Sequence, residues 1–199
     1  MTTKNKQNSP SRARTAGRKG RQVSPWAWVG LAVPLVALLV IIIVGSVASE
    51  PGSAIEAQQA PAFTLPDTAG GTQSLDEILA RGDALLYFSM GVGCDGCFDQ
   101  IPEAAAGLQA RGVQLVPVMV DGAEMVAHEA ARFGITTPIL IDESREVSDA
   151  YGMLGVYGHG DRPNHSFALV RADGTVAWVK HYATMFVPLD QLLADMGQA

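Results

Sequence analysis

An uncharged apolar stretch over residues 26–48, WAWVGLAVPLVALLVIIIVGSVA, constrains this chain more than any other feature. Its 23 residues are about the length that an α-helix needs to cross roughly 30 Å of hydrocarbon. Trp26 and Trp28 stand at its start, where indole rings favour the headgroup interface of a bilayer. We therefore expect a single transmembrane anchor that divides the chain into a short tail and one larger domain.

Two other interpretations of the stretch stay open. The small residues Ser46, Val47 and Ala48 have the spacing of a signal-peptide cleavage site, and the stretch could also form a buried helix of a soluble protein. The apolar region of a signal peptide usually spans only about 7 to 15 residues. The greater length found here favours an uncleaved anchor.

Charge is distributed unevenly on the two sides of residues 26–48. Residues 1–25 hold seven of the 14 bases and no acid, whereas the seven remaining bases and all 20 acids follow residue 49, giving that part a formal charge of −13. Positive residues next to a span stay on the cytoplasmic side. We expect a disordered cytoplasmic tail, lipid contact through residues 26–48 and an extracytoplasmic domain at the cell membrane. The acidic domain argues against nucleic acid as a partner.

Residues 49–59 are expected to form a linker, and residues 60–199 one domain with a single core. In this domain short apolar strands alternate with helices, a pattern typical of parallel strands covered by helices. A hairpin around Asp173-Gly174 then adds antiparallel strands, and a helix ends the chain. The expected strands cover 83–89, 113–120, 137–142 and the hairpin 166–182; the expected helices cover 98–112, 123–134, 143–152 and 187–196. The predicted class is α/β, a three-layer sandwich with a central mixed sheet.

Cys94 and Cys97, the only cysteines, lie between the first buried strand and the helix after it. Two cysteines three apart at the start of a helix can close a small disulfide, and the helix N-terminus favours the thiolate of the exposed cysteine. The same spacing also serves zinc sites. A purely structural bridge is a poor explanation, because a loop of two intervening residues closes little chain entropy. An extracytoplasmic compartment permits a disulfide.

Three local patterns together resemble one known superfamily. They are APAFTLPDTAGGTQSLDEI (60–78), a Cys-x-x-Cys directly after a buried strand with Pro102 five residues beyond Cys97, and the late hairpin with its terminal helix. The chain resembles the thioredoxin-fold superfamily, in the branch shared by membrane-anchored thiol-disulfide oxidoreductases and alkyl-hydroperoxide-reductase-like redoxins. The resemblance covers about residues 58 to 196.

The resemblance implies a thiol-disulfide oxidoreductase with a redox-active disulfide and no metal or nucleotide cofactor. Cys94 would attack and form a mixed disulfide, Cys97 would resolve it, and Pro102 would kink the active-site helix. The partners would be protein thiols or disulfides outside the membrane and a membrane electron donor or acceptor. Between the cysteines stand Asp95 and Gly96; the acid either opposes thiolate formation or acts as a helix N-cap.

Thioredoxin-like proteins place a cis-proline opposite the cysteines, just before the strand that enters the hairpin. His165 stands nearest to that place in this chain, and Pro163 lies two residues earlier. Three interpretations remain: Pro163 supplies the cis-proline, His165 faces the cysteines, or His165 is a loop histidine bonded to the backbone.

Two alternative functions follow from the same residues. The peroxiredoxin pattern Pro-x-x-x-Thr-x-x-Cys, aligned on Cys97, places Met90 at the proline and Cys94 at the threonine. Arg162 is the candidate for the arginine that would polarise a peroxide. A copper-handling protein of the same fold would bind Cu(I) through Cys94, Cys97 and His165, since soft thiolates suit this ion; the copper-delivery proteins it weakly resembles use Cys-x-x-x-Cys.

Overall fold

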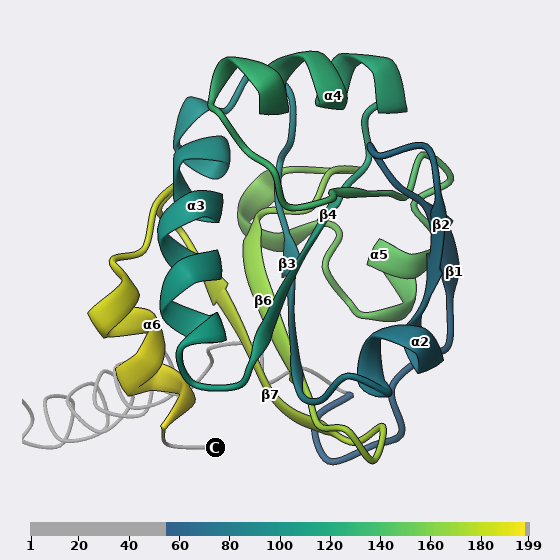
Figure 1. The fold of residues 1–199 in the computed structure, drawn as a ribbon, viewed down its shortest axis with the longest axis vertical. Helices are drawn as coiled ribbons and strands as arrows, with labels where there is room; N and C mark the ends of the chain where they lie inside the picture. The colour runs from purple at the N-terminus through teal and green to yellow at the C-terminus, as the bar shows by residue number, and fades with distance from the viewer. Residues whose placement is uncertain (1–54, 198–199) are drawn as a thin grey trace, which may run out of the picture. The chain divides into compact units, whose positions relative to one another are not determined.

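A five-stranded sheet in the order β5-β4-β3-β6-β7 forms the middle layer of the structure, a computed structural model that describes residues 55–197 (Figure 1). β3 and β4 are parallel, as are β4 and β5, whereas β6 runs antiparallel to both β3 and β7. The predicted mixed sheet is therefore confirmed. The strands of this sheet are β3 (Ala84–Phe88), β4 (Gln114–Met119), β5 (Leu140–Ile141), β6 (His165–Val170) and β7 (Val176–Tyr182).

Helices cover both faces of this sheet. Along β3, Leu85 and Tyr87 join one hydrophobic cluster and Leu86 and Phe88 join the other, because successive side chains of a strand point to opposite faces. The first cluster is completed by α3, α4 and α6, and the second by α2 and the β1–β2 hairpin. The bounds are β1 (Thr64–Pro66), β2 (Thr72–Ser74), α2 (Leu75–Leu79), α3 (Asp95–Gln109), α4 (Ala123–Arg132), α5 (Glu146–Ala150) and α6 (Leu189–Met196).

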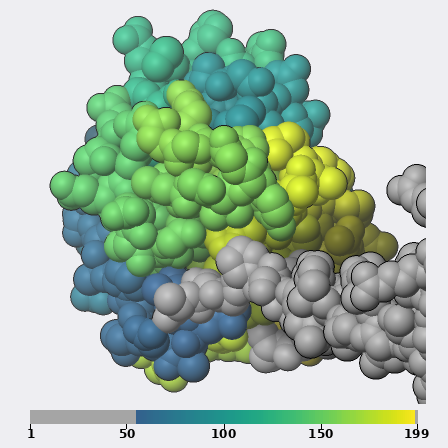
Figure 2. Space-filling model, turned by 180° about the vertical axis from the view of Figure 1, so that it is seen from behind, coloured from purple at the N-terminus to yellow at the C-terminus, as the bar shows by residue number. Residues whose placement is uncertain are grey.

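The second face is also covered by the segment between β5 and β6. It contains α5 and a short 3-10 turn, Val156–Gly158, and it occupies the centre of the face seen from behind, in green in Figure 2. Tyr151 at the end of α5 is fully buried, and its hydroxyl donates to the carbonyl of Pro61 at 3.0 Å. This contact ties the segment to the opening hairpin.

The β1–β2 hairpin and α2 lie within residues 60–78, one of the three patterns on which the resemblance rests. Ser74 is the N-cap of α2, its hydroxyl accepts from the Glu77 N–H at 3.3 Å, and its own N–H donates to Glu77 Oε2 at 2.9 Å. This reciprocal pair is a capping box, which begins α2 at Leu75.

Pro117 lies inside β4 without breaking the sheet. The Gln114 N–H donates to the Asp83 carbonyl on the β3 side, so the backbone nitrogen of residue 117 points away from β3 by the alternation of a strand. On that side β5 pairs with β4 only from Val118 onward. Although β4 is an inner strand of the sheet, Pro117 therefore takes no hydrogen bond away from its pairing with β3 or β5.

The expected basic tail and the expected transmembrane span lie outside the described residues. Among residues 55–197, no helix is long and apolar enough to cross a membrane.

Candidate active site

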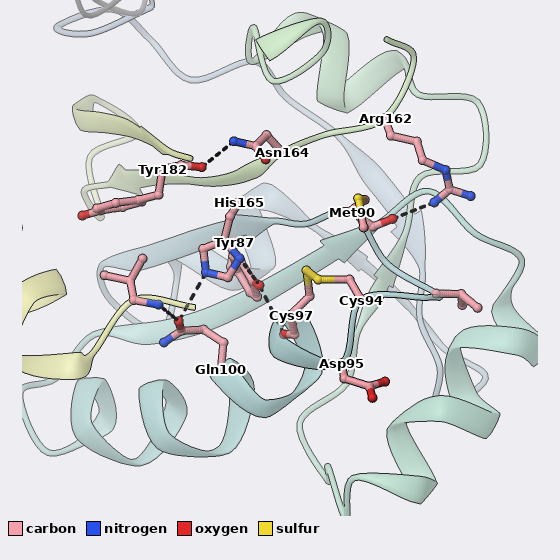
Figure 3. Close-up of a disulfide and its surroundings, with 12 residues drawn as sticks. Tyr87, Met90, Cys94, Asp95, Cys97, Gln100, Arg162, Asn164, His165 and Tyr182 are labelled. Atoms are coloured by element: carbon pink, nitrogen blue, oxygen red, sulfur yellow. Dashed lines mark hydrogen bonds between the residues drawn. A yellow bond between two sulfur atoms is a disulfide. The ribbon is translucent and has the colours of Figure 1, made fainter. Parts of the chain in front are cut away.

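Cys94 and Cys97 form a disulfide at the start of α3 (Figure 3). Cys94 is the N-cap of the helix and Cys97 lies in its first turn. The turn is tight, since the Cys94 N–H donates to the Gly91 carbonyl at 3.1 Å and the Cys97 N–H to the Cys94 carbonyl at 3.0 Å. The two Cα atoms are 5.3 Å apart, within the range that a disulfide requires.

The two cysteines differ in their access to solvent. Cys94 is 5% exposed and Cys97 is fully buried under the helix and the sheet. The unpaired N–H groups of the first turn of α3 carry the positive end of the helix dipole, which stabilises a thiolate at this position. In the closed pair, Cys94 is therefore the one cysteine with any exposed surface.

An ion pair holds the loop that leads to the disulfide. Arg162 Nη1 donates to the Met90 carbonyl at 2.6 Å, and its Nη2 lies 2.5 Å from Asp121 Oδ1. Asp121 Oδ2 accepts from the Val92 N–H at 2.8 Å. Gly91 has a φ of +79° and no room for a Cβ beside the Asp121 carboxylate, so a glycine is required at this point of the loop.

A buried polar chain lies beneath the disulfide. The Tyr87 hydroxyl is 3.2 Å from the Cys97 carbonyl and 2.9 Å from His165 Nδ1, and His165 Nε2 is 3.2 Å from Gln100 Oε1. Burial lowers the pKa of His165 to about 4, and it raises the pKa of the Tyr87 hydroxyl well above its ordinary value. Both side chains are therefore neutral at pH 7.

The loop between β7 and α6 crosses the start of α3. The Val187 N–H donates to Gln100 Oε1 at 2.7 Å, and a Cβ on Gly96 would come within 2.8 Å of the Met185 carbonyl. Gly96 thus permits a close approach of two backbones beside the disulfide. Three segments thus meet around the disulfide loop and the start of α3: the loop after β3, the residues before β6 and the loop after β7.

Two expectations for the site are corrected. Asp95 is not the N-cap, because Cys94 occupies that position; the Asp95 side chain is 74% exposed and forms an ion pair with Arg132 at 2.7 Å. Pro163 does not supply a cis-proline, since no peptide bond among residues 55–197 is cis. Pro102 lies inside α3, as expected.

In the oxidised form the three residues of the copper hypothesis all have other partners. Cys94 and Cys97 are bonded to each other, and both ring nitrogens of His165 lie within hydrogen-bonding distance of Tyr87 and Gln100. In the part of the chain that the structure describes, no group of three His, Cys, Asp or Glu side chains could hold a metal ion.

Tyr87, Gln100 and Asp121 belong to the site but were not predicted. Asp121 had a usable signal, because it is an acid just beyond the end of an apolar strand that neighbours the cysteine-bearing strand. Gln100 and Tyr87 had none, since a polar residue in a helix and a tyrosine in a strand are ordinary surface or core residues.

A thioredoxin-like fold with a Cys-x-x-Cys disulfide at the start of a helix defines a thioredoxin-like oxidoreductase. The sequence matches the AhpC/TSA family over residues 57–179, and the chain belongs to this family.

The chain is similar to proteins of two kinds. The thiol-disulfide oxidoreductase ResA of Bacillus subtilis is 29% identical over 126 residues, which is 61% of this chain and 69% of that protein. A protein of Mycobacterium tuberculosis named as a peroxiredoxin, Rv2521, is 34% identical over 100 residues, 49% of this chain and 63% of that relative. This chain thus spans less than two thirds of the second relative.

The solved structure of peroxidoxin BcpB from Mycobacterium tuberculosis has a TM-score of 0.61 and 22% sequence identity, with 72% of this chain and 96% of that chain covered. At this level of identity the likeness shows the shared fold.

Proposed function

We propose that this protein is a membrane-tethered thiol-disulfide oxidoreductase that exchanges disulfides with protein partners outside the cytoplasmic membrane. The observation that carries the proposal is the disulfide at the N-terminus of α3, in which Cys94 is 5% exposed and Cys97 is fully buried. The similarity to ResA, a thiol-disulfide oxidoreductase, supports the same reaction class.

In the reducing direction, the Cys94 thiolate attacks one sulfur of a partner disulfide. A sulfur–sulfur bond forms to Cys94, the partner bond breaks, and the partner's second sulfur leaves as a thiolate that takes a proton. Cys97 then loses its proton and attacks Cys94, which closes the observed disulfide and releases the partner as a dithiol. The oxidising direction runs through the same mixed disulfide, with two electrons passing to this protein.

Residues 26–48 serve as the anchor in this proposal, with residues 1–25 in the cytoplasm and residues 49–59 as a linker. The apolar length and the charge distribution support this arrangement. An alkaline carbonate wash of membranes tests the tether: we expect the full chain to stay with the lipid and a chain lacking residues 1–49 to be released. A full chain that the wash releases would contradict the anchor.

The exchange reaction is tested by single cysteine substitutions in the full chain. Cys94→Ser is expected to abolish reduction of a model disulfide such as glutathione disulfide. Cys97→Ser retains the attacking thiol but lacks the resolving thiol. We therefore expect this variant to accumulate the mixed disulfide between Cys94 and its partner. If Cys94→Ser exchanges at the wild-type rate, the assignment of the nucleophile is wrong.

A thiol peroxidase is the second candidate, favoured by membership of the AhpC/TSA family and by the similarity to a protein named as a peroxiredoxin. Against it, the position of the peroxiredoxin threonine holds Cys94 and the proline position holds Met90. Arg162, the candidate for polarising a peroxide, is engaged by Asp121 and the Met90 carbonyl. We therefore place disulfide exchange first.

A further inference from the structure

Asp121 is a buried acid that binds an arginine next to the disulfide loop. It follows β4, is 6% exposed, and lies outside the Cys-x-x-Cys motif. We propose that Asp121 determines specificity by withholding the Arg162 guanidinium from Cys94, so that the thiolate reacts with disulfides in preference to hydroperoxides. The inference rests on the proposed role of Cys94 as the nucleophile.

The guanidinium donates to three acceptor atoms of two residues. Arg162 Nη2 lies 2.5 Å from Asp121 Oδ1, Nη1 lies 3.1 Å from Oδ2, and Nη1 also donates to the Met90 carbonyl at 2.6 Å. Three of the five N–H groups of the arginine are thus in use. Figure 3 shows the arginine reaching from the segment before β6 to Met90, in the loop that leads to Cys94.

The ion pair also cancels the arginine's charge at the site. The carboxylate raises the pKa of Arg162, so the guanidinium is charged, but a paired cation and anion produce a weak field at Cys94. Neutralising Asp121 alone would leave Arg162 only its weaker interaction with Asp161, which is itself paired with Arg145, and so a net cation beside the cysteine loop. Such a cation lowers the pKa of a nearby thiol and frees N–H donors for a bound reactant.

The two reactions differ in how much they need such donors. With a hydroperoxide, the Cys94 thiolate forms a sulfur–oxygen bond, the oxygen–oxygen bond breaks, and an alkoxide or hydroxide leaves and takes a proton. Cys97 then attacks the sulfenic acid, forms the disulfide and releases water. With a disulfide, the leaving group is a thiolate, which is a far weaker base than an alkoxide. A free guanidinium therefore accelerates the peroxide reaction more than disulfide exchange.

Other charged groups near the loop remain the same in every comparison below. Asp95 forms an ion pair with Arg132. On α4, Glu124 and His128 lie beside Val92 of the cysteine loop. Asp161 is adjacent to Arg162 in the sequence. A shift in the Cys94 pKa between the variants is therefore caused by the substituted groups.

Asp121→Asn in the full chain, with Cys97→Ser so that Cys94 is the only thiol, tests the proposal. The rate of alkylation against pH measures the pKa of Cys94, and loss of the thiol in hydrogen peroxide measures peroxide reactivity. We expect a pKa lower by about one unit and a peroxide rate about tenfold higher near pH 7. Unchanged values in a folded Asp121→Asn protein would overturn the proposal.

Asp83→Asn is the matched control. Asp83 also accepts from an arginine, Arg171 Nη1 at 2.9 Å, and from a backbone N–H, that of Ala172 at 2.8 Å, but it precedes β3 at the end remote from the cysteines. We expect this variant to leave the Cys94 pKa and the peroxide rate unchanged. Equal shifts in both variants would mean that Asp121 acts through general stability, which also overturns the proposal.

Arg162→Gln keeps the proposal testable if Asp121→Asn does not fold. This variant leaves the Asp121 carboxylate uncompensated, so the pKa of Cys94 should rise and the peroxide rate should not increase. A faster peroxide reaction here would overturn the proposal.

Exchange of the wild-type protein with glutathione disulfide is measured in parallel. Absence of this exchange would refute the proposed function. Normal exchange, together with an unchanged Cys94 pKa and peroxide rate in Asp121→Asn, would refute only the role of Asp121.

Discussion

At the scale of single residues, the site depends on neutral and paired polar groups beneath a disulfide. His165 is fully buried against Tyr87 and Phe167, with ring centroids 4.8 and 5.4 Å away. Its hydrogen bonds to Tyr87 and Gln100 do not compensate for the loss of solvation of a charged imidazole, so the neutral ring is favoured. A histidine that resists protonation links the stability of this region to pH.

His165 should make the protein less stable in mild acid. Its pKa is about 4 in the folded chain and about 6.5 when unfolded, so below pH 6.5 the unfolded state binds more protons. The free energy of unfolding is expected to fall by up to about 3 kcal/mol between pH 6.5 and pH 4 through this group. Urea unfolding over that pH range measures it.

His165→Gln removes the titrating group and should flatten this pH dependence, whatever its own cost in stability. His128→Gln on α4 is the control and should leave the slope unaltered. If His165→Gln and the wild type lose stability equally over this range, other groups cause the acid sensitivity.

At the scale of secondary-structure elements, the start of α3 is the point at which three loops meet. α3 begins at Asp95, three residues before the start of the helix expected from the sequence. The disulfide occupies its first turn, and the loop between β7 and α6 is bound to it through Gln100. The helix dipole therefore acts at a site whose walls are supplied by distant segments.

Gly96→Ala should disturb this junction. Alanine favours a helix over glycine by about 1 kcal/mol, yet its Cβ would meet the Met185 carbonyl, a backbone atom that cannot rotate away. We expect a net loss of about 1–3 kcal/mol in the free energy of unfolding and slower disulfide exchange.

Gly107→Ala in the same helix is the comparison, because its new Cβ meets only the flexible end of the Leu189 side chain. It should cost less stability and leave exchange unchanged. Denaturant titration measures the free energy of unfolding of both variants, and an exchange assay measures their rates of disulfide exchange. Equal losses in Gly96→Ala and Gly107→Ala would show that the contact with Met185 is unimportant.

At the scale of the whole molecule, the domain has two hydrophobic clusters on the two faces of one mixed sheet, and the disulfide lies where β3 runs into α3. The segments around it come from residues far apart in the chain, including the loop after β3, Asp121 after β4 and the residues before β6. A domain of this kind can exchange electrons without a bound cofactor, because the disulfide itself carries them.

A redox titration of residues 50–199 in glutathione or dithiothreitol buffers tests the domain as a unit. We expect one reversible two-electron transition with a midpoint between about −270 and −120 mV, the range of related dithiols. The mass shift after alkylation of free thiols measures the reduced fraction. A pair that stays closed in strong reductant, or two thiols that react independently, would refute a working dithiol.

Much of the fold could be predicted because its signals are local. The strands β3 and β4, the helices α4 and α6, and the hairpin around Asp173-Gly174 each have their own apolar period or turn residues within a short stretch. The order of these elements restricts the topology further, since parallel strands need helical crossovers. Boundaries were less accurate, as at the start of α3, because a helix end is determined by the loop packed against it.

The sequence by itself determined the α/β class, the mixed sheet, and a cysteine pair placed between a strand and a helix, because each depends on neighbours along the chain. Only the tertiary structure decided that Cys94 rather than Asp95 caps α3, that Asp121 engages Arg162, and that His165 lies between Tyr87 and Gln100. Asp121 and Arg162 are separated by 41 positions in the sequence, and Tyr87 and His165 by 78. The formation of these contacts depends on how strands stack and loops meet in space, which no local pattern encodes.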